Sequence, residues 1–238
     1  MEDITDRGTF IKRTVLFPTV LELFKKYTKN KTVAAEFGCG DGAILQELVK
    51  LGIAKEVYGI DFNEQFINSL RLKYPEKRSR FLVQDITGEG LRYKFDLIVC
   101  SMVLLDMPEI DRALDNIFNS LNQDGKIIIA DINSDTYKAI GFWENGKFIK
   151  IHNPENVFHT EKMISGHTKA VHNYHPFNYY RSFFERKGMS CLEDFIIAIS
   201  KESVLNQTNI TSEDKERLIA ELEKDFANPP FHVIVLAK

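Results

Sequence analysis

Three glycines alternate with other residues in one short stretch of the chain, and a carboxylate stands on either side of them. Gly38, Gly40 and Gly42 follow a short apolar run that contains Glu36, and Asp61 ends a second apolar run 19 residues after Gly42. Because glycine has no side chain, such a turn lets a ligand approach the backbone, and the helix after it offers free N–H groups. A carboxylate at the end of the second run can accept both hydroxyls of a ribose. These residues predict a nucleoside site.

The spacing of the glycines indicates which kind of nucleoside this is. Dinucleotide-binding turns read G-x-G-x-x-G, and their third glycine allows close helix packing around a pyrophosphate. This chain reads E-x-G-x-G-x-G from Glu36 to Gly42, and a carboxylate in that place repels a pyrophosphate but attracts a cationic aminoacyl tail. A tight turn with a purely structural role needs only one such glycine. We therefore expect a nucleoside with a cationic tail rather than a dinucleotide.

An alternation of strands and helices must position these residues. Runs rich in Val, Ile and Phe are separated by helical patterns, which is typical of a parallel sheet with helices on both faces. The expected strands are 32–37, 56–60, 80–84, 95–100, 125–132, 189–200 and 231–238. The expected helices are 17–27, 42–51, 63–74, 108–121, 175–189 and 211–226. We expect the first of these helices to pack over the edge of the sheet. In such a sheet a ligand lies beyond the carboxyl ends of the strands, where the glycine turn stands.

Further segments follow the glycine turn in order. They are GID at 59–61, VQDI at 83–86 and FDLIVCSMVLLDMP at 95–108. Together with the turn, this pattern resembles the class I S-adenosylmethionine-dependent methyltransferases over about residues 32–132. An opening R-x-x-x-x-P segment at 13–18 and a YHP…YYRSFFERKGM stretch at 174–189 are similar to the small-molecule methyltransferases of the methyltransferase-11/12 type. Pro176 stands where that type commonly has an arginine, so no role is carried over to it.

The resemblance implies a fold, a domain layout and a cofactor. The fold is a Rossmann-like doubly wound α/β fold, with a seven-stranded, mostly parallel sheet, a C-terminal antiparallel strand and a lid inserted after the fifth strand. A single domain would cover 1–238, with an N-terminal helical segment at 1–31, the donor-binding core at 32–132, the acceptor-side lid at 133–175 and the rest of the sheet at 176–238. The methyl donor would be S-adenosyl-L-methionine, and the product S-adenosyl-L-homocysteine.

The resemblance also implies a set of donor-binding residues. Glu36 and the glycines would line the methionine end of the donor, and Asp61 would hold the ribose. Arg13 would reach the donor carboxylate, although an arginine on an N-terminal helix is more often a solvated charge. An exposed aromatic and two residues after the third strand would surround the adenine, and the end of the fourth strand would face the methyl group. The full set is Arg13, Glu36, Gly38, Cys39, Gly40, Gly42, Asp61, Phe62, Asp85, Ile86, Ser101, Met102 and Val103.

Histidines gather in the segment expected to form the lid. Residues 133–175 hold five of the six histidines and the only tryptophan, and an irregular segment of this length is typical of a binding element. His172, Tyr174 and His175 are the candidates for a general base that removes a proton from the acceptor, although a lone histidine is more often a surface or packing residue. No metal is expected, because His167, His172 and His175 have no helical ligand spacing and no cysteine or carboxylate joins them.

Charge and composition narrow the possible functions. With 31 Lys and Arg against 34 Asp and Glu, the net charge is −3, so the basic excess of a protein that grips many phosphates is missing. The NPPF tetrapeptide at 228–231 precedes the last strand, where it is expected to form a turn rather than hold a nucleobase amino group. The three separated cysteines favour no disulfide framework, no apolar run approaches a membrane span, and the charged N-terminus is unlike a secretory signal. We expect a cytoplasmic location.

The sequence therefore predicts a methyltransferase that acts on an oxygen or nitrogen of a small-molecule acceptor, with no membrane and no nucleic acid as partner. Two other functions stay open. A tRNA or protein methyltransferase would be expected to show a basic face, and a donor-binding protein without transferase activity would keep only the glycine turn and Asp61.

Overall fold

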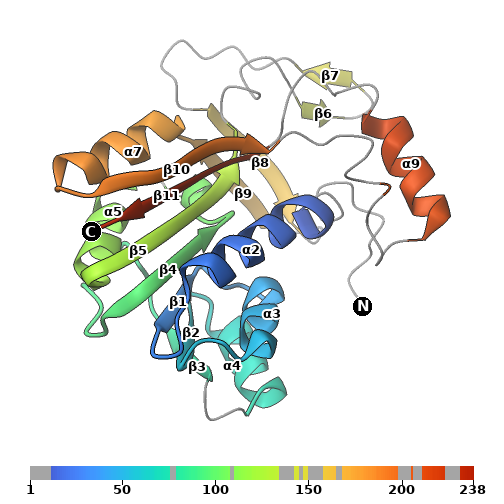
Figure 1. The fold of residues 1–238 in the computed structure, drawn as a ribbon. Coiled ribbons are helices and arrows are strands. Elements are labelled where there is room, and N and C mark those ends of the chain that lie inside the picture. Colours follow the sequence, from blue (N-terminus) through green and yellow to red (C-terminus); the bar gives the residue numbers. More distant parts are fainter. Residues whose placement is uncertain are drawn as a thin grey trace.

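The structure is a computed structural model that describes residues 12–75, 79–107, 110–133, 142–144, 147–149, 158–164, 168–197, 205, 211–222 and 231–238. Seven strands form one sheet in the order β10-β11-β5-β4-β1-β2-β3 (Figure 1). Their bounds are β1 Val33–Phe37, β2 Glu56–Asp61, β3 Ser79–Val83, β4 Phe95–Ser101, β5 Leu121–Ile132, β10 Ser190–Ile197 and β11 Phe231–Ala237. β11 runs antiparallel to β5 and β10, and the other neighbouring pairs are parallel.

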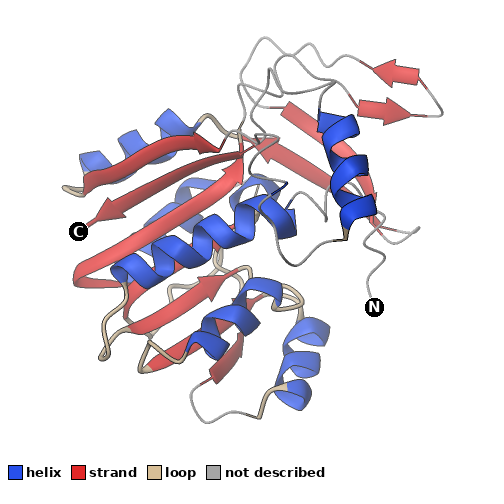
Figure 2. Ribbon diagram, turned by 45° about the vertical axis from the view of Figure 1, so that its right-hand side comes forward, coloured by secondary structure: helices blue, strands red, loops and turns tan. Residues whose placement is uncertain are grey.

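Helices cover both faces of this sheet (Figure 2). They are α2 Phe17–Tyr27, α3 Ala43–Leu51, α4 Glu64–Lys73, α5 Ile110–Ser120, α7 Phe177–Arg186 and α9 Ser212–Leu222, with the π-helix η1 Lys12–Leu16 and the 3₁₀ turn η2 Leu104–Asp106. α2, α3 and α4 pack on one face, and α5 and α7 pack on the other. The predicted doubly wound fold with an antiparallel last strand is confirmed, and the strand order reverses between β1 and β4, where such folds bind ligands.

The path of α2 differs from the expectation. Its buried side chains, Val20, Leu23 and Phe24, belong to the same apolar cluster as Val99 of β4 and Ile128 of β5. α2 therefore crosses the middle of one face (Figure 1), and the prediction that it packs over the edge is wrong. The C-terminal end of α2 reaches the edge strand β10, where Lys26 Nζ lies 2.9 Å from a Glu193 carboxylate oxygen. The apolar stripe of α2 is wide enough to cover the central strands.

β5 begins earlier than expected, at Leu121 rather than Gly125. The residues between them are polar, so the sequence does not indicate a strand there. Asn122 Nδ2 donates a 2.6 Å hydrogen bond to Asp96 Oδ1 of β4, and this side-chain bond, together with the pairing of Phe95 with Leu121, extends the strand. The bounds of the other described strands and helices differ from the predicted ones by a few residues, as is usual at element ends.

Between β5 and α7 the described residues form two hairpins. β6 Phe142–Glu144 pairs with β7 Lys147–Ile149, and β8 Phe158–Ile164 pairs with β9 Thr168–Tyr174. β9 packs against η2, which follows the end of β4. The rest of the expected lid lies outside the described residues, as do His167 and residues 228–230 of the NPPF turn, so the lid stays a prediction. Within the described part of the chain, none of the helices has the length and apolar character that a membrane crossing requires.

Candidate functional site

The glycine turn after β1 is built from left-handed backbone. Gly38, Gly40 and Gly42 have φ values of 70°, 49° and 77°, a region that other residues enter only at a cost. The N–H groups of Gly38 and Cys39 both donate to the Ile60 carbonyl, at 2.7 and 3.1 Å. The turn is therefore bound to the carboxyl end of β2, as the predicted nucleoside site requires.

The three glycines serve two different purposes. A Cβ atom built on Gly38 would lie 2.0 Å from a Val103 methyl, and one on Gly42 would lie 2.5 Å from a Leu70 methyl. These two positions are glycine because neighbouring side chains pack against them. At Gly40 no described atom lies within 4 Å of the added Cβ. Gly40 thus presents bare backbone to open space, which is where a ligand can approach.

Asp61, the predicted ribose acid, lies directly on this turn. Its Oδ2 accepts a 2.8 Å hydrogen bond from the Gly40 N–H, and its Oδ1 accepts one of the same length from the Asn63 N–H. The side chain is 7% exposed. Since each carboxylate oxygen can accept two hydrogen bonds, both oxygens keep capacity for ribose hydroxyls. The structure brings the glycine turn and Asp61 together, as the sequence predicted.

Glu36, at the end of β1, is a buried carboxyl with an unused oxygen. It is 3% exposed, and its Oε2 has no hydrogen-bond partner among the described residues. Burial, followed by the charges of Asp41 and Asp61, raises the pKa of Glu36 well above its usual range. Burying a polar atom without a partner is costly. This orphaned oxygen therefore fits a site that a cationic or hydrogen-bonding ligand completes.

The predicted adenine residues follow the carboxyl ends of β2 and β3. Phe62 is 75% exposed, so its ring is available to cover an aromatic base. Asp85 is exposed, and its Oδ1 accepts hydrogen bonds from the N–H and hydroxyl of Thr87, at 2.8 and 2.7 Å. Ile86 is buried, and its carbonyl accepts a 2.7 Å bond from Asn116 Nδ2. In this structure the Asp85 side chain shapes its own turn.

The end of β4 abuts the glycine turn. Val103 is the side chain that packs on Gly38. Met102, before it, is the one non-glycine residue with positive φ, 57°, in the described part of the chain, and its N–H donates to the Ala130 carbonyl at 2.9 Å. Ser101 is buried, and its hydroxyl has no partner among the described residues. A strained residue and an orphaned hydroxyl at one strand end are typical of a functional site.

Known proteins resemble this chain in sequence and in fold. The family model described as "Methyltransferase domain" matches residues 35–127, which run from β1 into β5. Residues 35–127 therefore resemble a methyltransferase domain. The resemblance predicted from the glycine turn and the strand ends is thereby confirmed, and the matched segment contains both the glycine turn and the end of β4.

Curated relatives of the methyltransferase domain act on different acceptors. Malonyl-[acyl-carrier protein] O-methyltransferase of Bacillus anthracis is 21% identical over 136 residues, which is 57% of this chain and 51% of that protein. A tRNA U34 carboxymethyltransferase of Campylobacter jejuni is 27% identical over 154 residues, which is 63% of this chain and 50% of that protein. The chain spans about half the length of the curated relatives it matches.

Solved structures share the fold of the methyltransferase domain over nearly the whole chain. The S-adenosylmethionine-dependent methyltransferase from Mesorhizobium loti has a TM-score of 0.69 at 15% identity, covering 92% of this chain and 96% of that one. The N-methyltransferase NodS from Bradyrhizobium japonicum, in complex with S-adenosyl-L-homocysteine, has a TM-score of 0.59 at 15% identity, covering 99% and 90%. At these identities the likeness concerns the fold.

Two polar residues beside the domain's β4 end were missed by the sequence analysis. Asp131 and Asn133, at the end of β5, are 2% and 4% exposed. Asp131 Oδ2 accepts from the Leu105 N–H at 3.2 Å, and its Oδ1 accepts from the Ile132 N–H at 2.7 Å, so this carboxyl holds the chain segment after Val103. The signal was available, because parallel strands end at the same edge and a polar residue after IIIA in β5 must lie beside Ser101.

Among the acceptor-side candidates, His175 is the one whose ring the structure describes. It precedes α7 and stacks on the Tyr179 ring, with ring centroids 5.7 Å apart and an interplanar angle of 29°. His172 and Tyr174 lie in β9, paired with Thr160 and Phe158, and their side chains lie outside the described set. Arg13 is exposed on η1. Within the described residues, no three His, Cys, Asp or Glu side chains gather as metal ligands.

Proposed function

We propose that this chain binds S-adenosyl-L-methionine and transfers its methyl group to an oxygen or nitrogen of a small-molecule acceptor. The observation that carries the proposal is the hydrogen bond from the Gly40 N–H to Asp61, which joins the bare turn and the ribose acid into one unit. The methyltransferase-domain match and the likeness to a structure solved with S-adenosyl-L-homocysteine support it.

The residues present fit this donor. The Glu36 Oε2, which has no partner among the described residues, can accept a hydrogen bond from the donor's ammonium group. Gly40 leaves space for the sulfonium-bearing chain. Asp61 can accept further hydrogen bonds from the ribose hydroxyls. Phe62 is exposed enough to cover the adenine. An ammonium beside Glu36 would also offset the desolvation that disfavours its carboxylate form.

When bound, the donor supplies a methyl group made electrophilic by the positive sulfur. The chain must hold an acceptor lone pair in line with the methyl carbon, at about 3 Å, and keep water away from it. We assign this to the β4 end, where Ser101, Met102 and Val103 meet the glycine turn, and to the acceptor-side segments around β9. For a hydroxyl or a protonated amine, His175 would take the acceptor's proton.

A small molecule is the acceptor class that we favour. The net charge of −3 argues against an acceptor covered with phosphates, because such binding depends on a basic excess. One relative is nevertheless named for tRNA and another for an acyl-carrier protein, so these acceptors are outcomes that the experiment must separate. A cytoplasmic location stays a prediction of the sequence.

The test is a transfer assay with tritiated methyl donor against fractionated small metabolites, RNA and protein. We expect label in the small-metabolite fraction, lost in the Asp61→Ala variant. Label found only in RNA or only in protein would show that the acceptor is a macromolecule, and the proposed methyl transfer would still hold. Donor binding with no label in any fraction would leave a binding protein without transferase activity.

A further inference from the structure

The first two turns of α7 are fixed to α5 by a tyrosine. The Tyr179 hydroxyl donates to the Asp111 carboxylate of α5. This hydrogen bond, with burial and the charge of Asp111, raises the pKa of Tyr179 to about 12, so the phenol keeps its proton and remains a donor at any physiological pH. Because the bond lies near the surface, it contributes little to overall stability. Its effect is on where the Tyr179 ring lies.

That ring supports His175. The imidazole stacks on Tyr179 at a centroid distance of 5.7 Å and meets the edge of Tyr180 at 6.2 Å and 62°. Tyr180 is 1% exposed, so its ring is held in place by the surrounding core. An imidazole between one stacked ring and one edge-on ring is restricted in both of its side-chain torsions.

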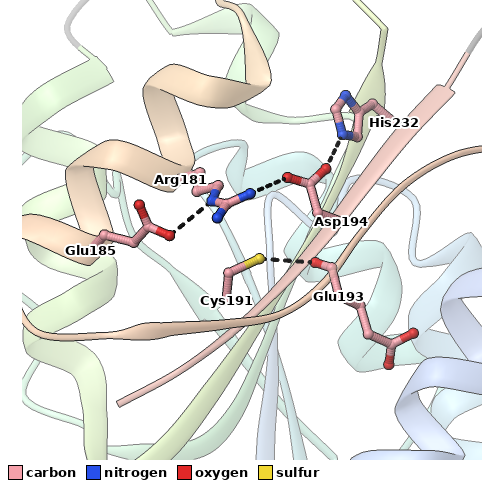
Figure 3. Close-up of polar contacts among 6 residues, drawn as sticks. All are labelled: Arg181, Glu185, Cys191, Glu193, Asp194 and His232. Carbon is pink, nitrogen blue, oxygen red and sulfur yellow. Dashed lines mark hydrogen bonds and ion pairs between the residues drawn. The ribbon is translucent and has the colours of Figure 1, made fainter.

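A second anchor holds the same helix against the sheet. Phe177 stacks on His232 of β11, with ring centroids 4.1 Å apart and an angle of 13°. His232 Nε2 shares a 2.6 Å hydrogen bond with Asp194 Oδ1 of β10, and Arg181 Nη1 of α7 donates to Asp194 Oδ2 at 3.1 Å (Figure 3). α7 is therefore attached to two strands and to α5, and its start cannot shift without breaking one of these contacts.

The start of α7 lies on the strand-end side of the sheet. Phe177, the first residue of α7, stacks on His232, and His232 pairs with Asp131 at the end of β5, so the start of α7 lies near that strand end. β9 ends at Tyr174, directly before His175, and packs against η2. η2 in turn follows Ser101–Val103, the residues that we assign to the methyl group. His175 thus lies on the side where the proposed transfer takes place.

We propose that Tyr179 is a positioning residue, which, held by Asp111, fixes the His175 imidazole so that it takes the proton of the methyl acceptor. This inference rests on the proposed function. In the step, a lone pair on the acceptor oxygen or nitrogen forms the bond to the methyl carbon, and the carbon–sulfur bond breaks with its electrons going to sulfur. The acceptor's proton passes to a ring nitrogen of His175 and then to solvent.

The experiment compares three variants of the full chain. Tyr179→Leu removes the supporting ring, and Tyr179→Phe keeps the ring but loses the bond to Asp111. Tyr58→Phe is the matched control, since Tyr58 Oη donates a bond of the same kind to Glu56 Oε2, at 2.8 Å, within β2. The readouts are the ring ¹³C–¹H NMR signals of His175, assigned with His175→Gln, the affinity for S-adenosyl-L-homocysteine by calorimetry, and single-turnover methyl transfer.

We expect the His175 signals to move toward those of an unstacked histidine in Tyr179→Leu, and part of the way in Tyr179→Phe. The dissociation constant for the product should stay within about twofold of wild type, while the transfer rate falls about tenfold in Tyr179→Leu, the scale at which general-base catalysis is partly lost. Tyr58→Phe should change none of the three. If both the His175 signals and the transfer rate change more in Tyr179→Leu than in Tyr179→Phe, the effect is one of positioning rather than a general loss of stability.

Unmoved His175 signals in both Tyr179 variants would overturn the inference, as would a wild-type transfer rate in Tyr179→Leu. If S-adenosyl-L-homocysteine does not bind the wild-type chain, the proposed function itself is overturned. The NMR comparison needs no ligand, so these two failures are distinguishable. Should Tyr179→Leu fail to fold, Tyr179→Phe, which preserves the ring and its packing, gives the decision.

Discussion

The backbone N–H of Gly40 donates a 2.8 Å hydrogen bond to Oδ2 of Asp61, 21 residues further along the chain. The bond joins the turn after β1 to the end of β2 at the point where the strand order reverses. No described atom lies within 4 Å of a Cβ atom added at Gly40, and the bond fixes the Asp61 carboxylate beside this open space. In our proposal this contact sets where the donor binds and how its ribose is held.

Replacing Asp61 by alanine should weaken donor binding strongly. The ribose hydroxyls would lose a charged acceptor, and hydrogen bonds to charged groups contribute about 1.5 to 3 kcal/mol, or roughly 10- to 150-fold in the dissociation constant. Calorimetry with S-adenosyl-L-homocysteine measures this. Asp124→Ala, at an exposed carboxylate near the start of β5, is the control. Equal affinities of Asp61→Ala and wild type, both folded, would remove Asp61 from the site.

Alanine at Gly40 should block the donor while sparing the fold. The added methyl meets no described atom within 4 Å, so the cost to the protein is the left-handed backbone, about 1 to 2 kcal/mol. The methyl would occupy the space through which we expect the donor to approach, and binding should fall below detection.

Gly188→Ala is the matched control for this experiment. Gly188 follows α7 with φ 88° and also has no described atom within 4 Å of an added Cβ, so it carries the same backbone strain away from the turn. The two variants should show similar thermal stability and different donor affinity. Wild-type affinity in Gly40→Ala would mean that the donor does not approach the turn there.

Glu36→Gln should change how stability depends on pH. In the unfolded chain a glutamate titrates near pH 4.3, whereas in the folded chain burial and the charges of Asp41 and Asp61 raise the Glu36 pKa well above that. Between the two values the unfolded state ionises more readily, so the free energy of unfolding falls as pH rises. Glutamine does not ionise. The free energy of unfolding of the variant minus that of wild type should therefore be larger at about pH 8 than at about pH 5.

Denaturant unfolding at both pH values, without ligand, measures this difference. Glu89→Gln, at an exposed glutamate, provides the control and should show no such change with pH. A stability difference between Glu36→Gln and wild type that is the same at both pH values would show that Glu36 is not held in a raised-pKa environment.

The local parts of the fold could be predicted from the sequence, because they depend on local patterns. Buried parallel strands such as VAAEF and FDLIVCS read as mostly apolar runs. Asn63 is a residue type that commonly caps helices, and it accepts hydrogen bonds from the N–H groups of Gln65 and Phe66 at the start of α4. The glycine turn and Asp61 were predictable for the same reason, since their spacing reflects one strand–turn–helix unit.

Long-range packing could not be predicted in this way. The position of α2 across the central strands depends on which helix covers which face, and the apolar stripe alone does not decide between face and edge. The early start of β5 depends on a bond between Asn122 and Asp96, two polar residues that give no strand signal. The contacts of Tyr179 with Asp111 and His175 join elements far apart in the chain, and only the folded arrangement shows them.

The most direct test of the central claim is calorimetric titration of the purified chain with S-adenosyl-L-homocysteine and, separately, with NAD. The glycine spacing, the orphaned Glu36 oxygen and the bond between Gly40 and Asp61 predict binding of the former with a dissociation constant on the order of micromolar, about −8 kcal/mol, and no heat from NAD. Binding of NAD together with no response to S-adenosyl-L-homocysteine would contradict the account.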